Sequence, residues 1–291
     1  MKLAVLGPGE KFIRNSTKRI IEEAKKEFKN VDLVPLIDVK LRINKGVDVI
    51  WNNKSLKDYD YILPRIDSKR AAIGYPIISF LDDLNVAKPY PASTVLIAHN
   101  KFLTLQEMVK NNISVPETWL TGSRDSAFEI IEKEKMPLMI KILAGFGGEG
   151  VMVMESKDAA KSVLDAMTTL KQEVLIEKYL PNQGEDIRIM IAGQEVIAGF
   201  KRIAKNEEKR ANIHLGGRAV SFRPTPEMKE IALKAADAVN SKICAIDIIE
   251  SKGKIYVVEV NINPGLGGIE EASGINVAKH IVDFVKSEIK Q

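Results

Sequence analysis

The sequence contains very little cysteine and no long apolar run. Its single cysteine is Cys244, so an intrachain disulfide and a cysteine-based metal site are both excluded. No apolar stretch approaches the roughly 18 residues that a membrane helix needs. The first ten residues are interrupted by Gly7, Pro8 and Gly9 too early for a secretory signal. These absences predict a soluble, cytosolic protein that does not enter membranes.

The sequence also lacks a strong charge of either sign. Its 43 basic and 39 acidic residues leave a formal net charge of +4, so overall charge does not indicate a nucleic-acid partner. Apolar residues, by contrast, make up 45% of the 291 positions. That is enough to bury a substantial core and to build two or three subdomains.

Apolar periodicity and capping residues divide the chain into expected subdomains at 1–95, 96–180 and 181–291. In the first, Ser16 is expected to cap a helix, and Pro89 and Pro91 mark a boundary near residue 95. The expected strands are Lys2–Leu6, Val31–Val34, Tyr61–Pro64, Leu138–Leu143, Val151–Glu155, Glu173–Leu180, Asp186–Ile191, Glu195–Ile203, Ile243–Glu250 and Ile255–Asn261. The expected later helices are Ile77–Leu84, Lys101–Lys110, Arg124–Lys135, Lys157–Leu170, Pro226–Val239 and Val277–Ile289, with caps at Ser123, Ser156 and Thr225. The pattern predicts an α+β architecture of three subdomains with mixed sheets.

The hairpin Ala245–Asn261 carries the sharpest signal for chemistry. A three-residue turn at 252–254 would place Asp247 opposite Glu259, and Asn261 would share the face of Glu259. Two facing carboxylates repel each other, and their apolar neighbours leave that repulsion poorly screened. A hard divalent cation such as Mg²⁺ would resolve the conflict, since it prefers oxygens of Asp, Glu and Asn. The alternative is an exposed hairpin face with two unrelated acids.

A second signal is the glycine-rich segment Gly145–Gly150, which follows an expected strand. Successive glycines let backbone N–H groups approach an anion without obstruction by a Cβ atom. The spacing is not that of a P-loop, and most glycine-rich loops are simply turns. Lys141 lies between Ile140 and Ile142 on the preceding strand, where it would need an anionic partner if buried. Its position just before the loop favours an anion site.

A third signal is the basic stretch Phe200–Arg223. Arg202 and Arg210 each lie beside a patterned element, and the planar fork of arginine suits carboxylate and phosphate oxygens. Lys205 and Lys209 of the stretch fit a solvated face. His214 could act as a base, but a lone histidine is more often structural.

Taken together, these segments resemble the RimK-like branch of the ATP-grasp ligases over nearly the whole chain. The resemblance rests on motifs in a fixed order, none of them specific alone: Pro64-Arg65-Ile66, His99-Asn100-Lys101, Ile140-Lys141-Ile142 with the glycine-rich segment, Gly184-Glu-Asp-Ile-Arg188, Lys201-Arg202, Arg210-Ala-Asn-Ile-His-Leu-Gly-Gly217, Ala245-Ile-Asp247, and Glu259-Val-Asn-Ile-Asn-Pro-Gly-Leu-Gly-Gly-Ile-Glu270. It implies an ATP-grasp fold preceded by an N-terminal α/β pre-ATP-grasp domain.

The resemblance also assigns roles to particular positions. It implies ATP as co-substrate, with phosphate lysines, a glycine flap, an adenine-binding segment and an acid near the ribose. The phosphate lysines are Lys101 and Lys141, and the flap glycines are Gly147, Gly148 and Gly150. The adenine-binding segment is Glu177, Lys178, Tyr179 and Leu180, and the acid near the ribose is Asp186. Asp247, Glu259 and Asn261 match ligands of two Mg²⁺ ions, with Mn²⁺ as an alternative metal. Arg202, Arg210 and Asn212 match catalytic positions around the transferred phosphate and the acyl phosphate.

The activity that the resemblance implies is ADP-forming ligation of a carboxylate to an amine through an acyl phosphate. Glutamate is the expected amino acid, and the expected acceptor is a small acid or the glutamyl or carboxylate tail of a coenzyme. The high lysine content and the lack of an appended domain favour that acceptor. Alternatives are a ribosomal protein C-terminus and a carrier protein of lysine biosynthesis. A homo-oligomer, dimeric or tetrameric, is also expected.

Two competing hypotheses come from other functional classes. One is a non-catalytic nucleotide-binding or ribosome-associated module, which predicts loss of the acidic metal residues; Asp247, Glu259 and Asn261 are all present. The other is phosphoryl transfer to an acceptor that is not a carboxylate. The N-terminal third matches the family only in outline, and Glu149 occupies a flap position that is often apolar in relatives. These departures leave the acceptor open.

Overall fold

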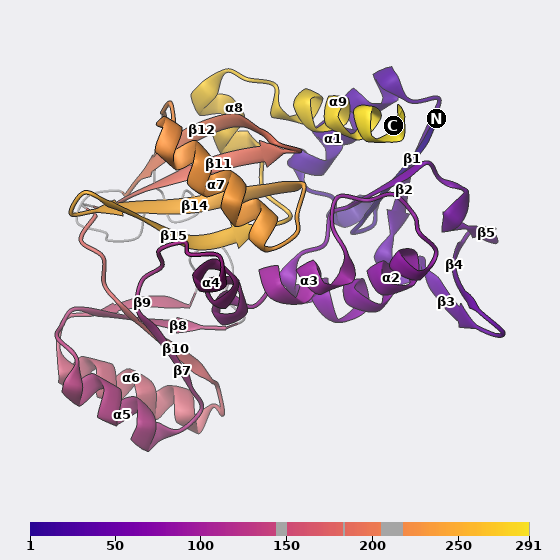
Figure 1. Ribbon diagram of the computed structural model, residues 1–291. Helices are drawn as coiled ribbons and strands as arrows, with labels where there is room; N and C mark the ends of the chain where they lie inside the picture. Colours follow the sequence, from indigo (N-terminus) through magenta and orange to yellow (C-terminus); the bar gives the residue numbers. More distant parts are fainter. Residues whose placement is uncertain (144–149, 183, 205–217, 291) are drawn as a thin grey trace.

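The computed structural model describes residues 1–143, 150–182, 184–204 and 218–290, in which the strands form four β-sheets. The first is parallel, with the order β2 (Asn30–Pro35), β1 (Lys2–Gly7), β6 (Tyr61–Pro64). Strands β1 and β6 are buried almost throughout, as expected for a parallel sheet covered on both faces. Helices α1 (Asn15–Glu27), α2 (Ala71–Asp83) and α3 (Ala92–Ala98) belong to this N-terminal part (Figure 1).

A small antiparallel sheet extends the N-terminal part away from the rest of the molecule (Figure 1). It consists of β3 (Lys40–Ile43), β4 (Val47–Trp51) and β5 (Lys54–Ser55). Short 3-10 helices lie at Glu10–Phe12, Leu36–Asp38, Leu56–Asp58 and Ser68–Arg70. The last of these follows β6 directly and contributes to the site described below.

The central part is a separate lobe with its own core (Figure 1). Its antiparallel sheet has the order β7 (Thr118–Thr121), β10 (Val174–Lys178), β8 (Leu138–Ile142), β9 (Val151–Met154). Helices α5 (Arg124–Lys133) and α6 (Lys157–Thr169) pack on this sheet. The helix α4 (Lys101–Lys110) precedes the lobe and packs on the third part of the chain.

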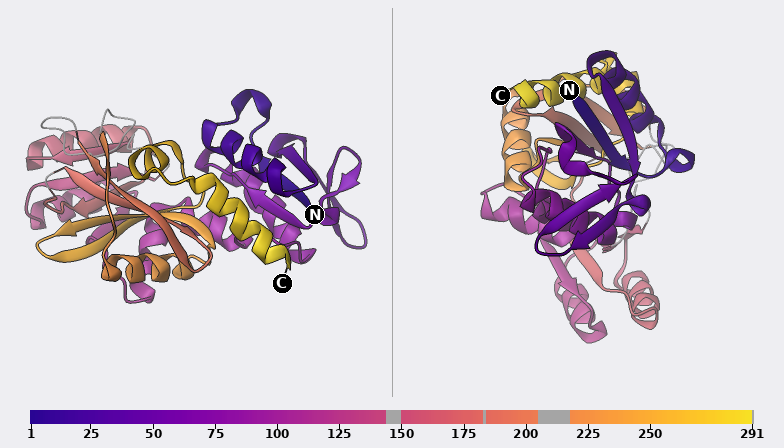
Figure 2. Two further views of the ribbon diagram at one scale, coloured as in Figure 1. Left: turned by 90° about the horizontal axis from the view of Figure 1, so that it is seen from above. Right: turned by 90° about the vertical axis from the view of Figure 1, so that its right-hand side faces the viewer.

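The third part is a five-stranded antiparallel sheet between two groups of helices (Figure 1). Its order is β13 (Arg218–Ser221), β12 (Glu195–Ile203), β11 (Glu185–Ala192), β14 (Ile243–Ser251), β15 (Lys254–Asn261). Helix α7 (Pro226–Ala238) packs on one face. Helices α8 (Gly267–Ser273) and α9 (Val277–Lys290) pack on the other, where α9 extends across to the N-terminal part (Figure 2).

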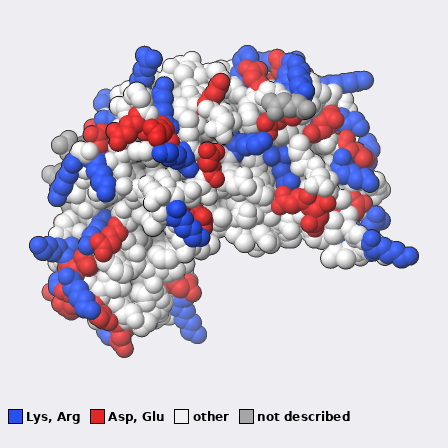
Figure 3. Space-filling view, in the orientation of Figure 1, with Lys and Arg blue, Asp and Glu red and all other residues white. Residues whose placement is uncertain are grey.

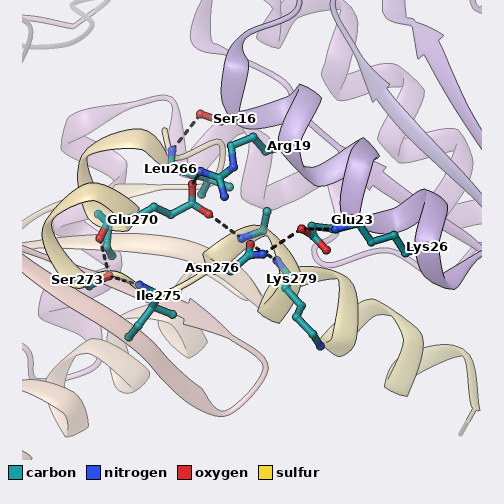
Figure 4. Close-up of polar contacts among 12 residues, drawn as sticks. Ser16, Arg19, Glu23, Lys26, Leu266, Glu270, Ser273, Ile275, Asn276 and Lys279 are labelled. Atoms are coloured by element: carbon teal, nitrogen blue, oxygen red, sulfur yellow. Dashed lines mark hydrogen bonds and ion pairs between the residues drawn. The ribbon is translucent and has the colours of Figure 1, made fainter.

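Polar contacts join α1 to α8, to the segment before α8 and to the segment before α9 (Figure 4). The guanidinium of Arg19 lies 2.6 Å from a Glu270 carboxylate oxygen, and Asn276 Nδ2 donates to Glu23 over 3.0 Å. The backbone N–H of Leu266 donates to Ser16 Oγ over 2.9 Å. The hydrophobic cores agree with these contacts, since each of the two largest includes residues of both the N-terminal part and the five-stranded sheet.

Most predicted elements are confirmed, and two expectations are wrong. Ser16 is not a helix cap: α1 begins at Asn15, and the Ser16 hydroxyl instead accepts the Leu266 N–H from the other end of the chain. The expected mixed sheets are also absent from the described residues, because each sheet is entirely parallel or entirely antiparallel. Caps at Ser123, Ser156 and Thr225 are confirmed, each accepting a backbone N–H.

Positively and negatively charged side chains are intermixed over the face shown in Figure 3, without a large patch of one sign.

Among the described residues, none of the helices combines the length and the apolar character that crossing a membrane demands.

Candidate active site

One face of the five-stranded sheet changes from apolar to charged along its strands. Near α8 and α9 this face carries apolar residues such as Met190, Phe200 and Ala245. Further along the same strands it carries Asp186, Arg188, Arg202, Asp247, Glu259 and Asn261. The pairing register brings five of them together, since Asp186 pairs with Arg202, Arg188 with Asp247, and Asp247 with Glu259; Asn261 lies two residues further along β15 on the same face. Strand alternation thus gathers residues from four strands at one place.

Two arginines and two aspartates form a largely buried ionic network on this face. Arg188 donates to both Asp247 carboxylate oxygens over 2.6 Å, and Arg202 Nη2 donates to Asp247 over 2.8 Å. Arg202 also forms a two-point contact with Asp186, at 2.5 and 2.7 Å. Burial alone would raise the pKa of Asp247, but the charges of Arg188 and Arg202 lower it to about 2. Asp247 therefore remains a carboxylate at neutral pH.

The pairing of Asp247 with Glu259 is confirmed, but the turn that predicted it is wrong. The turn has two residues, Lys252 and Gly253, both with positive φ, and Ser251 pairs with Lys254. That turn alone would shift the register by one residue. A β-bulge in β15 at Val258 restores it, because Ile248 pairs with Val257 and Asp247 with Glu259.

A pocket at the edge of this sheet is lined by three separate parts of the chain. The loop after β6 contributes Asp67 and Ser68. The junction of α3 and α4 contributes Ala98, His99, Lys101 and Thr104, and the end of β15 with the following residues contributes Val258, Glu259, Asn261 and Asn263. Asn100 caps α4 by accepting the N–H groups of Phe102 and Leu103. This cap fixes the helix start on which Lys101 lies.

The buried Arg65 fixes the chain just after the pocket-lining strand. Its guanidinium donates to the Pro264 carbonyl over 2.8 Å and to the Thr17 hydroxyl over 3.3 Å. Burial lowers the pKa of Arg65 to about 10, so it stays cationic at neutral pH. Asn261 and Asn263 precede Pro264, and the contact therefore ties their segment to the N-terminal part.

The central lobe brings a second lysine close to this pocket. Lys141 Nζ lies 2.6 Å from a Glu177 carboxylate oxygen, and both side chains are largely buried. The expectation that a buried Lys141 needs an anionic partner is confirmed. Burial lowers the pKa of Lys101, while Glu259 and Glu177 raise it and Lys141 lowers it further. These four charged groups are thus close enough to influence one another.

The donor set fits a magnesium ion in part. Glu259 and Asn261 both line the pocket and offer the oxygen ligands that Mg²⁺ prefers. Asp247 does not line the pocket, and its two oxygens already accept three hydrogen bonds. No group of three or more His, Cys, Asp or Glu suited to a metal occurs in the described part of the chain. Glu259 and Asn261 would thus hold the ion together with phosphate oxygens.

The other predicted ATP-site residues are distributed along the lobe and its exit. Gly150 closes the β8–β9 hairpin with φ of +73°, and a Cβ atom there would lie 2.2 Å from the Ile142 side chain. Lys178 ends β10; its side chain binds Glu117 and Glu134, and its backbone N–H donates to Glu117. Tyr179 and Leu180 follow it. Gly147, Gly148, Arg210, Asn212 and His214 lie outside the described residues.

Sequence reasoning assigned no role to Arg188, Asp67 or His99. A signal existed for Arg188, because it lies two residues after Asp186 and so shares its strand face. The partner strands could not be inferred without the fold. Asp67 and His99 lie 32 positions apart in the sequence and meet only through the packing of the β6 loop on the α3–α4 junction.

Comparison with known proteins identifies the family. A RimK-like ATP-grasp domain matches residues 98–285, and a RimK pre-ATP-grasp domain matches residues 1–94. The chain belongs to the RimK-like ATP-grasp family. A probable alpha-L-glutamate ligase of Thioalkalivibrio sulfidiphilus is 31% identical to this chain, and the match covers 100% of this chain and 97% of the relative. The fold is therefore the predicted ATP-grasp fold with an N-terminal pre-ATP-grasp domain, and the protein is an ATP-dependent ligase.

Solved structures agree on the fold of the ligase. The ATP-grasp ligase PsnB, complexed with a minimal precursor, Mg and ADP, superposes with a TM-score of 0.76 at 14% identity, covering 99% of this chain and 97% of that one. A RimK domain protein from Sphaerobacter thermophilus superposes with a TM-score of 0.71 at 20% identity, covering 97% and 99%. At these identities the likeness concerns the fold alone.

We expect Lys141→Ala to weaken ATP about ten- to a hundredfold and to leave adenosine nearly unchanged, because charge-assisted contacts to phosphate would be lost. Removing Lys141 alone would leave the buried Glu177 carboxylate without its counter-charge. Lys141→Ala is therefore best combined with Glu177→Gln in one variant. Calorimetric titration with both ligands measures the difference. Lys133→Ala, at an exposed position of α5 where the side chain pairs with Glu129, is the control. Equal weakening of both ligands would assign Lys141 a structural role.

Proposed function

We propose that this ligase joins the amino group of L-glutamate to a carboxylate on a small acid or on the glutamyl or carboxylate tail of a coenzyme. The observation that carries the proposal is the pocket in which Lys101, Glu259 and Asn261 meet, next to Lys141 of the central lobe. The full-length relatives named probable alpha-L-glutamate ligases support glutamate as the amino acid.

The charges around the pocket suit a two-step reaction. A carboxylate oxygen of the acceptor attacks the γ-phosphorus of ATP, the bond to the β-phosphate oxygen breaks, and ADP leaves. Lys101 and Lys141 offset the negative charge of the phosphates. The amine nitrogen, once neutral, then attacks the acyl carbon; the bond from that carbon to the phosphate oxygen breaks, and inorganic phosphate leaves with the amine's proton as the amide forms. Arg202, or the predicted Arg210, would stabilise the oxyanion of that step.

Glu259 and Asn261 are the residues that would hold magnesium. When bound, the ion neutralises charge on the phosphate oxygens and helps to orient them. The ionic network of Arg188, Arg202 and Asp186 keeps Asp247 ionised behind these ligands. We propose that Asp247 supports the metal site from this position.

The test is ADP release measured against a panel of acceptors with glutamate as the first amino acid. We expect ADP to form in proportion to amide product, and only when ATP, L-glutamate and a carboxylate acceptor are all present. Arms with glutamyl di- and tripeptides, small dicarboxylic acids and acidic C-terminal peptides separate the acceptor classes. A stable phosphorylated acceptor formed without any amine would indicate a kinase-like reaction. Nucleotide binding with no turnover on any arm would indicate a non-catalytic module.

A further inference from the structure

The pocket contains a buried polar atom that no described residue satisfies. His99 lines the pocket, and its Nε2 is buried without a hydrogen-bond partner. A hydrogen bond with the backbone of Ile66 raises the pKa of the ring, and because Nε2 has no partner this bond falls to the other ring nitrogen. Tyr61 and Tyr90 also bury unpartnered hydroxyls, but neither lines the pocket. Since an unsatisfied buried polar atom is costly, Nε2 is suited to a partner that a ligand brings.

The hydrogen bond to Ile66 determines what kind of partner this is. A ring nitrogen that contacts a backbone carbonyl must donate its proton, so in the neutral ring Nε2 is an acceptor. Burial lowers the pKa of His99, against the opposing effects of Asp67 and of the Ile66 contact. A neutral ring at pH 7 therefore presents a lone pair to the pocket. Phosphate and carboxylate oxygens cannot pair with it, whereas an N–H or O–H donor can.

The surroundings of His99 favour a cationic donor. The Asp67 carboxylate lies near enough to raise the pKa of His99. It is held in place by Arg70, which donates to it from its backbone over 3.1 Å and from Nη1 over 2.5 Å. Lys101 is instead coupled to Glu259, Glu177 and Lys141. The pocket thus has an acceptor-rich side at Asp67 and His99 and a lysine-containing side toward the predicted phosphates.

The position of this acceptor-rich side in the fold is also typical of ligand recognition. Asp67 follows β6 at the carboxyl end of the parallel sheet, and open α/β sheets bind ligands at that edge. His99 reaches the same place from the α3–α4 junction, two residues before Lys101. Ligand groups bound by His99 and by Lys101 would therefore be neighbours.

We propose that His99 Nε2, together with the Asp67 carboxylate, binds the ammonium group of the amino-acid substrate and so directs its nitrogen toward the activated carboxyl. This assignment rests on the proposed function and names the subsite that function requires. The ammonium supplies both the N–H donor that Nε2 lacks and the positive charge that Asp67 favours.

The test compares two substitutions that retain different parts of the imidazole. Asn has its amide near the position of Nδ1, so His99→Asn keeps a donor for the Ile66 carbonyl and loses the acceptor in the pocket. Gln reaches the position of Nε2, so His99→Gln keeps an acceptor there. The 291-residue chain, loaded with Mg²⁺ and a non-hydrolysable ATP analogue, is titrated with L-glutamate and with N-acetyl-L-glutamate, which lacks the ammonium. His280→Asn makes the same change at an exposed position of α9 and is the control.

We expect the wild type to prefer L-glutamate over its N-acetyl derivative. His99→Asn should weaken L-glutamate about ten- to a hundredfold and lose that preference, with nucleotide affinity unchanged and with partial recovery in His99→Gln. Unchanged glutamate affinity in His99→Asn, or a wild type that binds both compounds equally, would overturn the proposal. So would a variant whose main defect is a raised Mg²⁺ requirement. If glutamate binds as expected but no acceptor is ligated, the subsite stands and the proposed reaction fails.

Discussion

Glu259→Gln and Asn261→Ala should each reduce magnesium-dependent ligation by on the order of a thousandfold or more. The expectation follows because metal-assisted charge stabilisation on phosphate contributes several kcal/mol, and each 1.4 kcal/mol corresponds to about a tenfold change in rate. Both side chains line the pocket rather than the hydrophobic core, so the fold should be preserved. Turnover measured across a range of Mg²⁺ concentrations, with thermal unfolding alongside, checks both statements.

Glu271→Gln on α8 is the matched control for the acidic substitution. Its side chain is exposed, one residue from the buried Glu270, and lies outside the pocket lining. It should retain wild-type turnover and magnesium dependence. If Glu259→Gln and Asn261→Ala also behave like the wild type, the proposed metal site is wrong.

Arg202→Ala should damage both stability and ligation. Arg202 is 5% exposed and contacts Asp186 and Asp247, so its loss leaves the buried Asp247 and the partly buried Asp186 short of a counter-charge. Breaking a buried ion pair in this way typically costs about 3–5 kcal/mol of unfolding free energy. If Arg202 also stabilises the oxyanion, single-turnover ligation should fall by roughly 10²–10³. ATP affinity, measured where the variant is folded, should be nearly unchanged.

Lys201→Ala and Arg202→Lys separate the two effects. Lys201 pairs with Glu185 at 2.8 Å with both side chains about a third exposed, so its removal should cost no more than about 1 kcal/mol. Arg202→Lys keeps the positive charge but loses the planar guanidinium that binds two oxygens at once. Its ligation rate should therefore be little higher than that of Arg202→Ala. The burial of Arg202 already excludes the simplest alternative, a surface cation. A parallel loss of ATP affinity and ligation would instead assign Arg202 to the nucleotide site.

The sequence predicts the elements of this fold well because they obey local rules. Helix α4 and strands β6 and β12 have the predicted bounds, and three predicted serine and threonine caps are present. The strands β3, β4 and β5 were not foreseen, because they are short and only partly buried and so show little alternation. Ser16 fits the local pattern of a cap, but a contact 250 residues away in sequence determines its role.

In the site, too, features set by neighbouring residues were predictable and features set by distant segments were not. Strand alternation brought Asp247, Glu259 and Asn261 onto one face, and this held although the turn is shorter than assumed, since the Val258 bulge compensates. The partners of Asp247 could not be predicted. Arg188 and Arg202 reach it because β11 lies between β12 and β14, an order that only the folded sheet defines.

The grouping of the cores divides the described part of the ligase into two packed units. One is the lobe, whose core contains buried residues of α5, α6 and β8–β10, with Trp119 of β7 and Met136 packed against them. The other joins the N-terminal part to the five-stranded sheet through shared cores and through Arg19, Ser16 and Arg65. Rotation about the two segments that connect the lobe would carry Lys141 toward or away from Glu259. It would leave the distances within the pocket unchanged. The contacts of Lys141 with the nucleotide could then vary while Lys101, Glu259 and Asn261 keep their positions relative to one another.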